Sequence, residues 1–399
     1  MKSYYVRHRP GNKGGFILAV IMLFSLGAAV YAGLSNGITN DNVAGPGFFS
    51  DMELGDLPPE EPVKYDLSLC YFYSQMDEFE KCIYETFYDM IMHKDIEDYS
   101  RSLSIPAMQY SSRGDDLYLI YHAMVEDNPE LFYLDVSEEP RVAISGYNSG
   151  DYTVLIFSLN PGIENENYMI GAFEYATRRF MEDINLHTSD AEIELQIHDK
   201  LIDLVSYDYQ AAEEPDIGGL AYTAYGALVD NGEGINNCAV CDGYAKAFLY
   251  LLKRAGIMSV KVSGTGGSAV GGIPFKGSHA WNAVLLDGDW YETDCTWDDP
   301  NLEKQDLDED TISILQSEEA YFASTHHWYN RTTEEMTSLP EDPDCVLEYP
   351  VENGTAVLHM CRDSYHLREL DSDEYGVEYF NYLNDMLPEA VGTAYRLET

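Results

Sequence analysis

The dipeptide Asp287-Gly288 separates two stretches of alternating polarity, and it constrains the fold of this chain more than any other feature. Residues 278–286 precede it and residues 289–296 follow it. Asp-Gly between two such stretches is a strong signal for a β-hairpin with a two-residue turn, because both turn residues adopt positive φ. The sequence therefore predicts an antiparallel hairpin over residues 278–296.

The register of this hairpin places a histidine and an aspartate on one face. A two-residue turn pairs Leu286 with Asp289, and continued pairing brings Trp281 opposite Asp294. Because cross-strand partners share a face and side chains alternate along a strand, His279 and Asp294 become diagonal neighbours. A turn with one more residue would separate them, so the prediction depends on register. A carboxylate beside an imidazole fixes its tautomer and stabilises its protonated form.

A helix that begins near Cys241 supplies a third group. Residues 241–255 have an apolar stripe at helical spacing, basic residues in the last turn and Gly256 directly after them. Unpaired N–H groups at a helix start stabilise an anion, so we expect the thiol to ionise more readily there. His279, held by Asp294, could take the thiol proton. Cys241, His279 and Asp294 are therefore the candidate catalytic residues, and a cysteine that only packs at a helix start is the alternative.

The residues around these positions resemble the transglutaminase-like superfamily. The resemblance rests on segments that occur in a consistent order: Cys241–Phe248, Ala255–Ile257, His279–Asn282, Leu286–Gly288, Trp290-Tyr291 and Asp294–Pro300. It covers roughly residues 185–330 and implies an α+β, papain-like core, in which the helix that bears the cysteine packs on an antiparallel sheet.

The resemblance also implies roles and a reaction class. Cys241 would be the nucleophile, His279 the general base and acid, and Asp294 the residue that orients His279. Family members join glutamine side chains to amines or hydrolyse amides, in both cases through a thioester on the cysteine. We therefore expect an enzyme, either a transglutaminase-like acyltransferase or a cysteine peptidase or amidase, which acts on protein or peptide amides. The alternative is a non-catalytic cell-surface binding protein that retains the fold.

Composition divides the chain into segments around this core. Residues 1–34 hold basic residues followed by an apolar run, which predicts a cleaved signal peptide or a retained membrane anchor. Residues 35–62 are rich in Gly, Pro and acidic residues and predict a linker. We expect an N-terminal α/β accessory region over residues 63–184, the catalytic domain over 185–345 and an acidic C-terminal extension over 346–399.

Local patterns predict elements in and after the accessory region. Apolar residues at helical spacing predict one helix near residues 79–91 and another that ends before Asn128. Two β-branched stretches around Asn148–Asp151 predict a hairpin. Ser189 and Glu192 have the spacing of a capping box and predict the start of a further helix.

The charge of the chain limits its partners and its location. A formal net charge of −47 over 399 residues repels phosphate backbones, so we expect no nucleic-acid partner. The expected partner is a protein or peptide substrate, with the apolar N-terminal segment as a candidate membrane tether. Basic residues before that segment place the bulk of the chain outside the cytoplasm, so we expect an extracytoplasmic protein, secreted or anchored.

Cysteine spacing leaves disulfides open. Cys70 with Cys82, and Cys345 with Cys361, could form short-loop disulfides in an oxidising compartment. Cys238 could also pair with Cys241 in the CxxC motif that they form, which would remove the nucleophile.

A zinc site is the competing interpretation of the same region. Cys238, Cys241, His279 and Cys295 could supply four ligands. The hairpin register, however, puts Cys295 on the opposite face from His279, and no second CxxC motif occurs. We therefore predict no metal and no cofactor.

Two further motifs have weaker interpretations. Gly264–Ala269 mimics a dinucleotide-binding fingerprint, but more glycines, a proline and a strand follow instead of a helix, so we expect a flexible loop beside His279. His326 and His327 are adjacent and would point apart on a helix or strand, so we expect packing or surface roles for them.

Overall fold

The computed structural model describes most of the chain after residue 66, and the expected N-terminal signal or anchor, the linker and the Cys345–Cys361 pair lie outside the described residues. No helix within the described ranges is long and apolar enough to cross a membrane. The described ranges are 67–92, 100–113, 116–134, 142–159, 166–213, 219–230, 237–268, 275–299, 325–338, 346–351, 354–359, 364–369 and 377–397.

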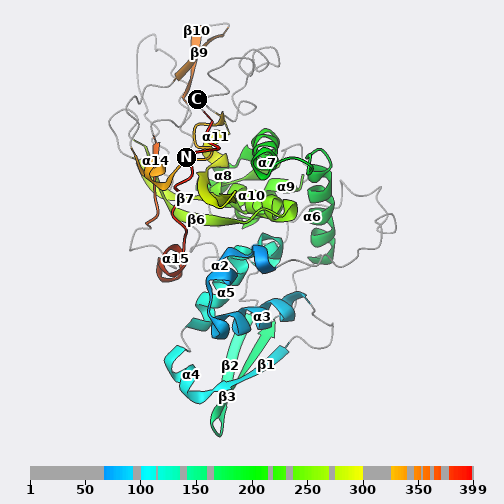
Figure 1. The fold of residues 1–399 in the computed structure, drawn as a ribbon. Coiled ribbons are helices and arrows are strands. Elements are labelled where there is room, and N and C mark those ends of the chain that lie inside the picture. Colours follow the sequence, from blue (N-terminus) through cyan, green and yellow to red (C-terminus); the bar gives the residue numbers. More distant parts are fainter. Residues whose placement is uncertain are drawn as a thin grey trace, which may run out of the picture.

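The first part of the described chain packs helices on one face of a three-stranded antiparallel sheet (Figure 1). The strand order is β1-β3-β2. The elements are η3 (Leu67–Leu69), α2 (Tyr71–Gln75), α3 (Glu78–Met92), β1 (Ser100–Pro106), α4 (Ala107–Arg113), α5 (Asp116–Asp127), η4 (Pro129–Leu134), β2 (Val142–Ser149) and β3 (Tyr152–Leu159).

The two helices and the hairpin predicted for this part are confirmed. The apolar face expected near residues 79–91 is the buried face of α3, and α5 ends at Asp127, directly before Asn128. The expected hairpin is β2 and β3, whose turn includes Gly150 at a φ of +65°. Glycine adopts that left-handed conformation without strain.

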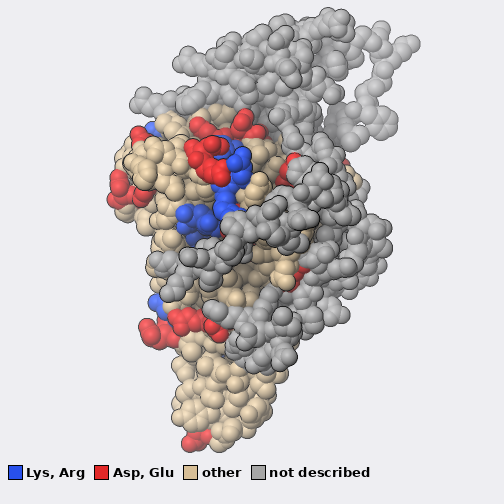
Figure 2. Space-filling model, turned by 90° about the vertical axis from the view of Figure 1, so that its right-hand side faces the viewer, with Lys and Arg blue, Asp and Glu red and all other residues tan. Residues whose placement is uncertain are grey.

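The net negative charge of the chain is spread unevenly. Within residues 142–159, Asp151 is the single charged residue, and Tyr147 and Tyr152 of this hairpin are exposed. Figure 2 shows the corresponding end of the molecule as largely uncharged, whereas acidic and basic side chains gather in groups nearer the other end.

The second part of the chain contains the predicted helix 241–255 as α10. The capping box of Ser189 and Glu192 starts α7, as predicted, and Gly256 ends α10 at a φ of +86°. The elements are α6 (Glu166–Met181), α7 (Asp190–Leu204), β4 (Ser206–Tyr207), α8 (Tyr209–Glu213), η6 (Gly219–Tyr222), α9 (Ala224–Leu228), β5 (Cys238–Ala239) and α10 (Cys241–Ala255).

A four-stranded antiparallel sheet forms the other half of this part, and α10 packs against it (Figure 1). The strand order is β11-β6-β7-β8, so the edge strand β11 comes from the region expected to be a C-terminal extension. The elements are β6 (Ser259–Ser268), β7 (Phe275–Leu286), β8 (Asp289–Thr293), α11 (Cys295–Asp298), α14 (Thr333–Thr337), β9 (Val346–Val351), β10 (Gly354–His359), β11 (Ser364–Leu367) and α15 (Val377–Asn384).

The predicted hairpin register is correct, but its second strand is shorter than expected. Leu286 pairs with Asp289, and both turn residues have positive φ. Pairing ends at Asn282 and Thr293, after which the chain turns into α11. The expected pairing of Trp281 with Asp294 is therefore absent from this ladder.

The glycine-rich segment is a strand rather than the flexible loop that we expected. Residues 264–268 complete β6, and the rest of the motif lies outside the described residues. The glycines are needed for close approach. A Cβ atom on Gly264 would lie 2.1 Å from the carbonyl oxygen of Leu367, and one on Gly267 would lie 2.3 Å from the Tyr365 ring.

The expected disulfide between Cys70 and Cys82 does not form. Both thiols are free, with Cys70 buried and Cys82 exposed. The sulfur of Cys70 instead lies 3.6 Å from Oδ1 of Asn128, to which it donates. Burial raises the pKa of the Cys70 thiol to about 12, so this cysteine has a packing role.

Candidate active site

Cys241 is the first residue of α10 and lies against strand β7. It is partly exposed, whereas the residues that follow it in the helix are buried. The backbone amide of Ala280, on that strand, lies near enough to the Cys241 sulfur to act against the rise in the pKa of its thiol. The side-chain amide of Asn282 donates to the carbonyl oxygen of Ala245 at 3.0 Å, which ties the same strand to the same helix. The sulfur is therefore held beside the residue that follows His279.

His279 and Asp294 meet as the hairpin register predicts. Nε2 of His279 lies 2.7 Å from Oδ2 of Asp294, and both side chains are buried. A carboxylate only accepts hydrogen bonds at neutral pH, so Nε2 carries the hydrogen and Nδ1 is the nitrogen left to accept a proton. This assignment gives the imidazole the tautomer that a general base requires.

Asp294 is positioned by the helix that it caps. Its Oδ1 accepts from the backbone N–H groups of Thr296 at 2.9 Å and Trp297 at 3.1 Å, at the start of α11. Aspartate is among the preferred residues at such a position because its carboxylate satisfies helix-start donors. One oxygen of Asp294 thus fixes the carboxylate to the backbone, and the other is free to contact His279.

A second histidine, which no sequence motif indicates, contacts the same carboxylate oxygen. Nε2 of His366, on β11, lies 2.9 Å from Oδ2 of Asp294. His366 is fully buried. It lies 72 residues from Asp294 in sequence and outside the segments of the family resemblance, so no local pattern marked it.

Tryptophan rings surround the two histidines. The His279 ring stacks on Trp297, with centroids 4.5 Å apart, and the His366 ring lies 4.2 Å from the same indole. Both Trp297 and Trp281 are buried. Because such surroundings exclude water, the hydrogen bonds to Asp294 act in a low dielectric, where they are stronger.

Burial dominates the protonation states of the site. Although Cys241 as a residue is partly exposed, desolvation of its sulfur raises the pKa of the thiol to about 11, and the neighbouring carboxylate of Asp242 adds to the effect. Burial also lowers the pKa of His279 to about 4, although Asp294 opposes this change. The thiol and the imidazole are therefore both neutral at neutral pH. We expected the helix start to make Cys241 ionise more readily. This is wrong for the resting site, because the cost of burying the thiolate charge is larger than the stabilisation that the helix-start N–H groups provide.

Asp294 remains ionised in spite of its burial. Desolvation acts to raise the pKa of its carboxyl, but His279 and His366 together hold it well below the ordinary range. The site therefore contains a fixed negative charge behind a neutral imidazole. That arrangement stabilises the positive charge that appears on His279 when the imidazole accepts a proton.

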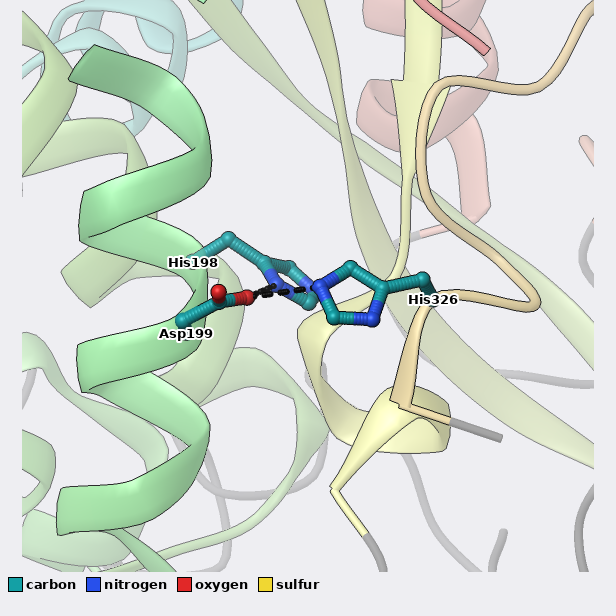
Figure 3. A group of neighbouring side chains, drawn as sticks. All are labelled: His198, Asp199 and His326. Atoms are coloured by element: carbon teal, nitrogen blue, oxygen red, sulfur yellow. Dashed lines mark hydrogen bonds and ion pairs between the residues drawn. The ribbon is translucent and has the colours of Figure 1, made fainter. Parts of the chain in front are cut away.

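A second group of titratable side chains lies at the other end of α11 (Figure 3). Oδ1 of Asp199 lies 2.9 Å from Nδ1 of His198 and 2.8 Å from Nε2 of His326. Nε2 of His198 lies 3.2 Å from Oδ2 of Asp298. Burial opposes protonation of His198, but the two carboxylates raise its pKa to about 9. The group is a hydrogen-bonded network, and His326 is a buried member of it rather than the packing or surface residue that we expected.

The zinc ligand set considered from the sequence does not assemble. Two groups of residues have ligand atoms close enough to hold a metal within the described part of the chain: His198, Asp199 and His326, and His279, Asp294 and His366. Neither group includes a cysteine. Cys295 is buried at the start of α11 rather than on a strand, so the argument from opposite strand faces does not apply to it.

Comparisons with known proteins agree with the sequence resemblance. Residues 178–295 match the family model for the transglutaminase-like superfamily. The chain is 36% identical over 97 residues to kyphoscoliosis peptidase of Mus musculus and 43% identical over 61 residues to kyphoscoliosis peptidase of Homo sapiens. These matches cover 23% and 14% of this chain, and they span only 14% and 9% of the two peptidases.

Two solved structures, described as a transglutaminase and a cysteine protease, match this chain at low similarity. A crystal structure of a transglutaminase (TGase) matches at 19% identity and a TM-score of 0.24, covering 38% of this chain and 43% of that chain. A protein from Cytophaga hutchinsonii, described as a cysteine protease, matches at 13% identity and a TM-score of 0.22, covering 39% of this chain and 62% of that chain. The family match and the packing of α10 on an antiparallel sheet confirm the predicted α+β, papain-like core.

Proposed function

We propose that this protein is a cysteine enzyme acting on protein or peptide amides, on the premise that residues 178–295 match the family model for the transglutaminase-like superfamily. A thioester at Cys241 would be the intermediate. One observation carries the proposal: the buried hydrogen bond of 2.7 Å between His279 and Asp294. His279 directly precedes Ala280 on β7, and the Ala280 amide affects the pKa of the Cys241 thiol, which supports a position of the sulfur near this pair.

The proposed first half-reaction begins from a neutral thiol and a neutral imidazole. The Cys241 sulfur attacks the amide carbonyl carbon, and its proton passes to Nδ1 of His279. Asp294 stabilises the imidazolium that forms. The C–N bond then breaks, the leaving amine takes the proton from His279, and the acyl group remains on sulfur as a thioester.

The second half-reaction depends on the acceptor. An amine that gives a proton to His279 and attacks the thioester yields a new amide, which is acyl transfer. Water that does the same yields a carboxylic acid, which is hydrolysis. Both routes restore the thiol of Cys241 and use the same three side chains, so both belong to the proposal.

The proposal also includes the location of the protein. We propose that it acts outside the cytoplasm, secreted or tethered by residues 1–34. Support comes from the order of basic and then apolar residues in that segment. A protein or peptide is the proposed substrate, and the strong negative charge of the chain argues against nucleic acid.

One observation favours the alternative of a binding protein that retains the fold without catalysis. Burial raises the pKa of Cys241 to about 11, so the resting thiol is a weak nucleophile. A binding protein would need the core but not proton transfer, and substitution of Cys241 would leave its ligand affinity unchanged.

An amine-incorporation assay tests the proposed reaction. The full chain is incubated with a glutamine-containing protein and a labelled primary amine, and incorporated label, released ammonia and peptide cleavage are measured. The Cys241→Ala variant removes the nucleophile, and Cys238→Ala is the matched control. We expect product from the wild type and from Cys238→Ala but not from Cys241→Ala. Equal output from the wild type and Cys241→Ala would overturn the proposed enzyme.

A further inference from the structure

We propose that His366 is a positioning residue, which shares the carboxylate of Asp294 with His279 and thereby sets the orientation and the basicity of His279. This inference rests on the proposed function, because it assigns His366 a role in the same site. His366 does not contact the Cys241 sulfur in any described interaction and acts through Asp294.

Hydrogen bonds from three elements fix the carboxylate of Asp294. Its Oδ2 lies 2.7 Å from Nε2 of His279 and 2.9 Å from Nε2 of His366, while its Oδ1 accepts from the two backbone N–H groups of α11. The carboxylate therefore accepts from three separate elements: β7, β11 and α11. Its plane cannot rotate without breaking at least one of these bonds, so His366 restricts the direction from which Asp294 contacts His279.

The strand between the two histidines, β6, has glycines at the positions that pair with them. In the register of β6, Gly264 pairs with His279 and Gly266 pairs with His366. A Cβ atom on Gly266 would lie 2.8 Å from the Trp297 ring and 3.0 Å from Cβ of His279. The glycine-rich strand thus allows imidazoles from two non-adjacent strands to reach one carboxylate.

Packing against indole rings fixes the orientation of the His366 side chain. It is fully buried, and its ring lies 4.2 Å from Trp297, 4.6 Å from Trp328 and 4.8 Å from Trp281, measured between centroids. A buried imidazole packed among three indoles has little freedom to turn away from Asp294. The contact is therefore a built feature of the core.

Sharing the carboxylate has a consequence for His279. A hydrogen bond from His366 to Oδ2 takes up part of the negative charge that would otherwise stabilise the His279 imidazolium. Within the described chain, Asp294 before α11 contacts His279 and His366 on β11 shares that carboxylate; Asp294 raises the His279 pKa, whereas His366 lowers it. Loss of the His366 donor should therefore loosen Asp294 and raise the pKa of His279.

The test compares three substitutions at one position in the full chain. His366→Gln keeps an N–H donor near the place of Nε2, His366→Asn has an amide too short to reach Asp294, and His366→Phe keeps a ring but no donor. Leu367→Ala is the matched control, because it alters the next residue of β11, whose side chain alternates to the other face. Amine incorporation is measured against pH, with thermal melting to confirm folding.

We expect kcat to fall roughly 10- to 100-fold in His366→Phe and His366→Asn, with KM little changed, as for residues that orient a reacting ligand. We also expect the acid limb of the pH profile to move to higher pH. His366→Gln should retain most of the activity, and Leu367→Ala should keep the wild-type profile. If His366→Phe does not fold, the comparison of His366→Asn with His366→Gln decides. If His366→Phe and His366→Asn keep the wild-type kcat and pH profile, the inference is overturned.

A second readout does not need turnover. In the full chain labelled with 15N-histidine, the Nε2–H groups of His279 and His366 should give separate downfield proton signals, assigned with His279→Gln and His366→Gln. We expect His279 to titrate at higher pH in His366→Asn than in the wild type, whether or not the wild type turns over. An unchanged His279 titration would refute the role of His366, whereas an inactive wild type with a shifted titration would refute only the proposed function.

Discussion

Alkylation of Cys241 by iodoacetamide should be slow at neutral pH, because burial keeps its thiol protonated. The thiolate is the species that reacts, so the rate follows the ionised fraction. At pH 7.5 a thiol at its ordinary pKa of 9.0 is about 3% ionised, whereas one with a pKa of about 11 is about 0.03% ionised. Cys241 should therefore react roughly 100-fold more slowly than a free thiol.

The assay follows adduct formation at Cys241 by peptide mass spectrometry between pH 5 and pH 10. Cys82 is exposed and serves as a reference thiol in the same chain, and Cys241→Ala identifies the peptide. The rate should rise about tenfold for each pH unit. A rate that levels off below pH 7 would refute the reasoning, because it would show a thiolate–imidazolium pair in the resting site.

Three further predictions concern the groups that hold the site. Asp294→Asn should lower kcat roughly 10³- to 10⁴-fold in the amine-incorporation assay, because the amide no longer fixes the tautomer of His279, and wild-type kcat would contradict this role. His198 has a raised pKa of about 9, so its protonation should add roughly 3 kcal/mol to the free energy of unfolding below pH 6.5, and this stabilisation is lost as pH rises through 9. Urea unfolding of the wild type and of His198→Gln at pH 6.5 and above pH 9 measures it. A difference between the two proteins that does not change with pH would exclude this stabilisation. Gly266→Ala should cost about 1–3 kcal/mol of unfolding free energy, because its Cβ would lie 2.8 Å from Trp297, and wild-type stability would mean that the rings can shift.

Signals local to the sequence predicted much of the fold. The Asp287-Gly288 turn fixes its own backbone conformation and hence the register of the strands beside it, so the contact between His279 and Asp294 followed from strand geometry. The start of α10 at Cys241 and its end at Gly256 followed from helix periodicity and from the preference for glycine at a left-handed position.

Features that depend on distant pairing could not be predicted in the same way. The sheet order β11-β6-β7-β8 puts His366 two strands from His279, and no spacing rule connects residues so far apart in sequence. The role of Asp294 as a helix cap was missed because the alternating pattern was extended beyond Thr293, although aspartate followed by Cys-Thr-Trp is compatible with a helix start. The raised pKa of Cys241 depends on packing, which only the folded structure supplies.

The short helix α11 joins the candidate catalytic residues to the ion network at its other end. It has four residues, Cys295–Asp298, and a helix of that length is unstable by itself. Asp294, which precedes the first residue of α11, is hydrogen-bonded to His279 and His366. Asp298, the last residue of α11, is hydrogen-bonded to His198 and accepts from the backbone N–H of Trp328 at 2.8 Å. The placement of the helix therefore depends on tertiary contacts at both ends.

This dependence predicts that the two ends of α11 are energetically coupled. His198 does not contact Asp294 in the described interactions. His198→Asn, whose amide is too short to reach Asp298, should nevertheless lower kcat several-fold by loosening the helix that Asp294 caps. Residues in one network show interaction free energies of about 0.5–3 kcal/mol, whereas independent sites add within about 0.3–0.5 kcal/mol. A double-mutant cycle of His198→Asn and His366→Asn, measured by urea unfolding and by kcat at pH 7, distinguishes coupled ends of α11 from independent ones. Additive effects on both quantities would mean that each end of α11 is fixed independently.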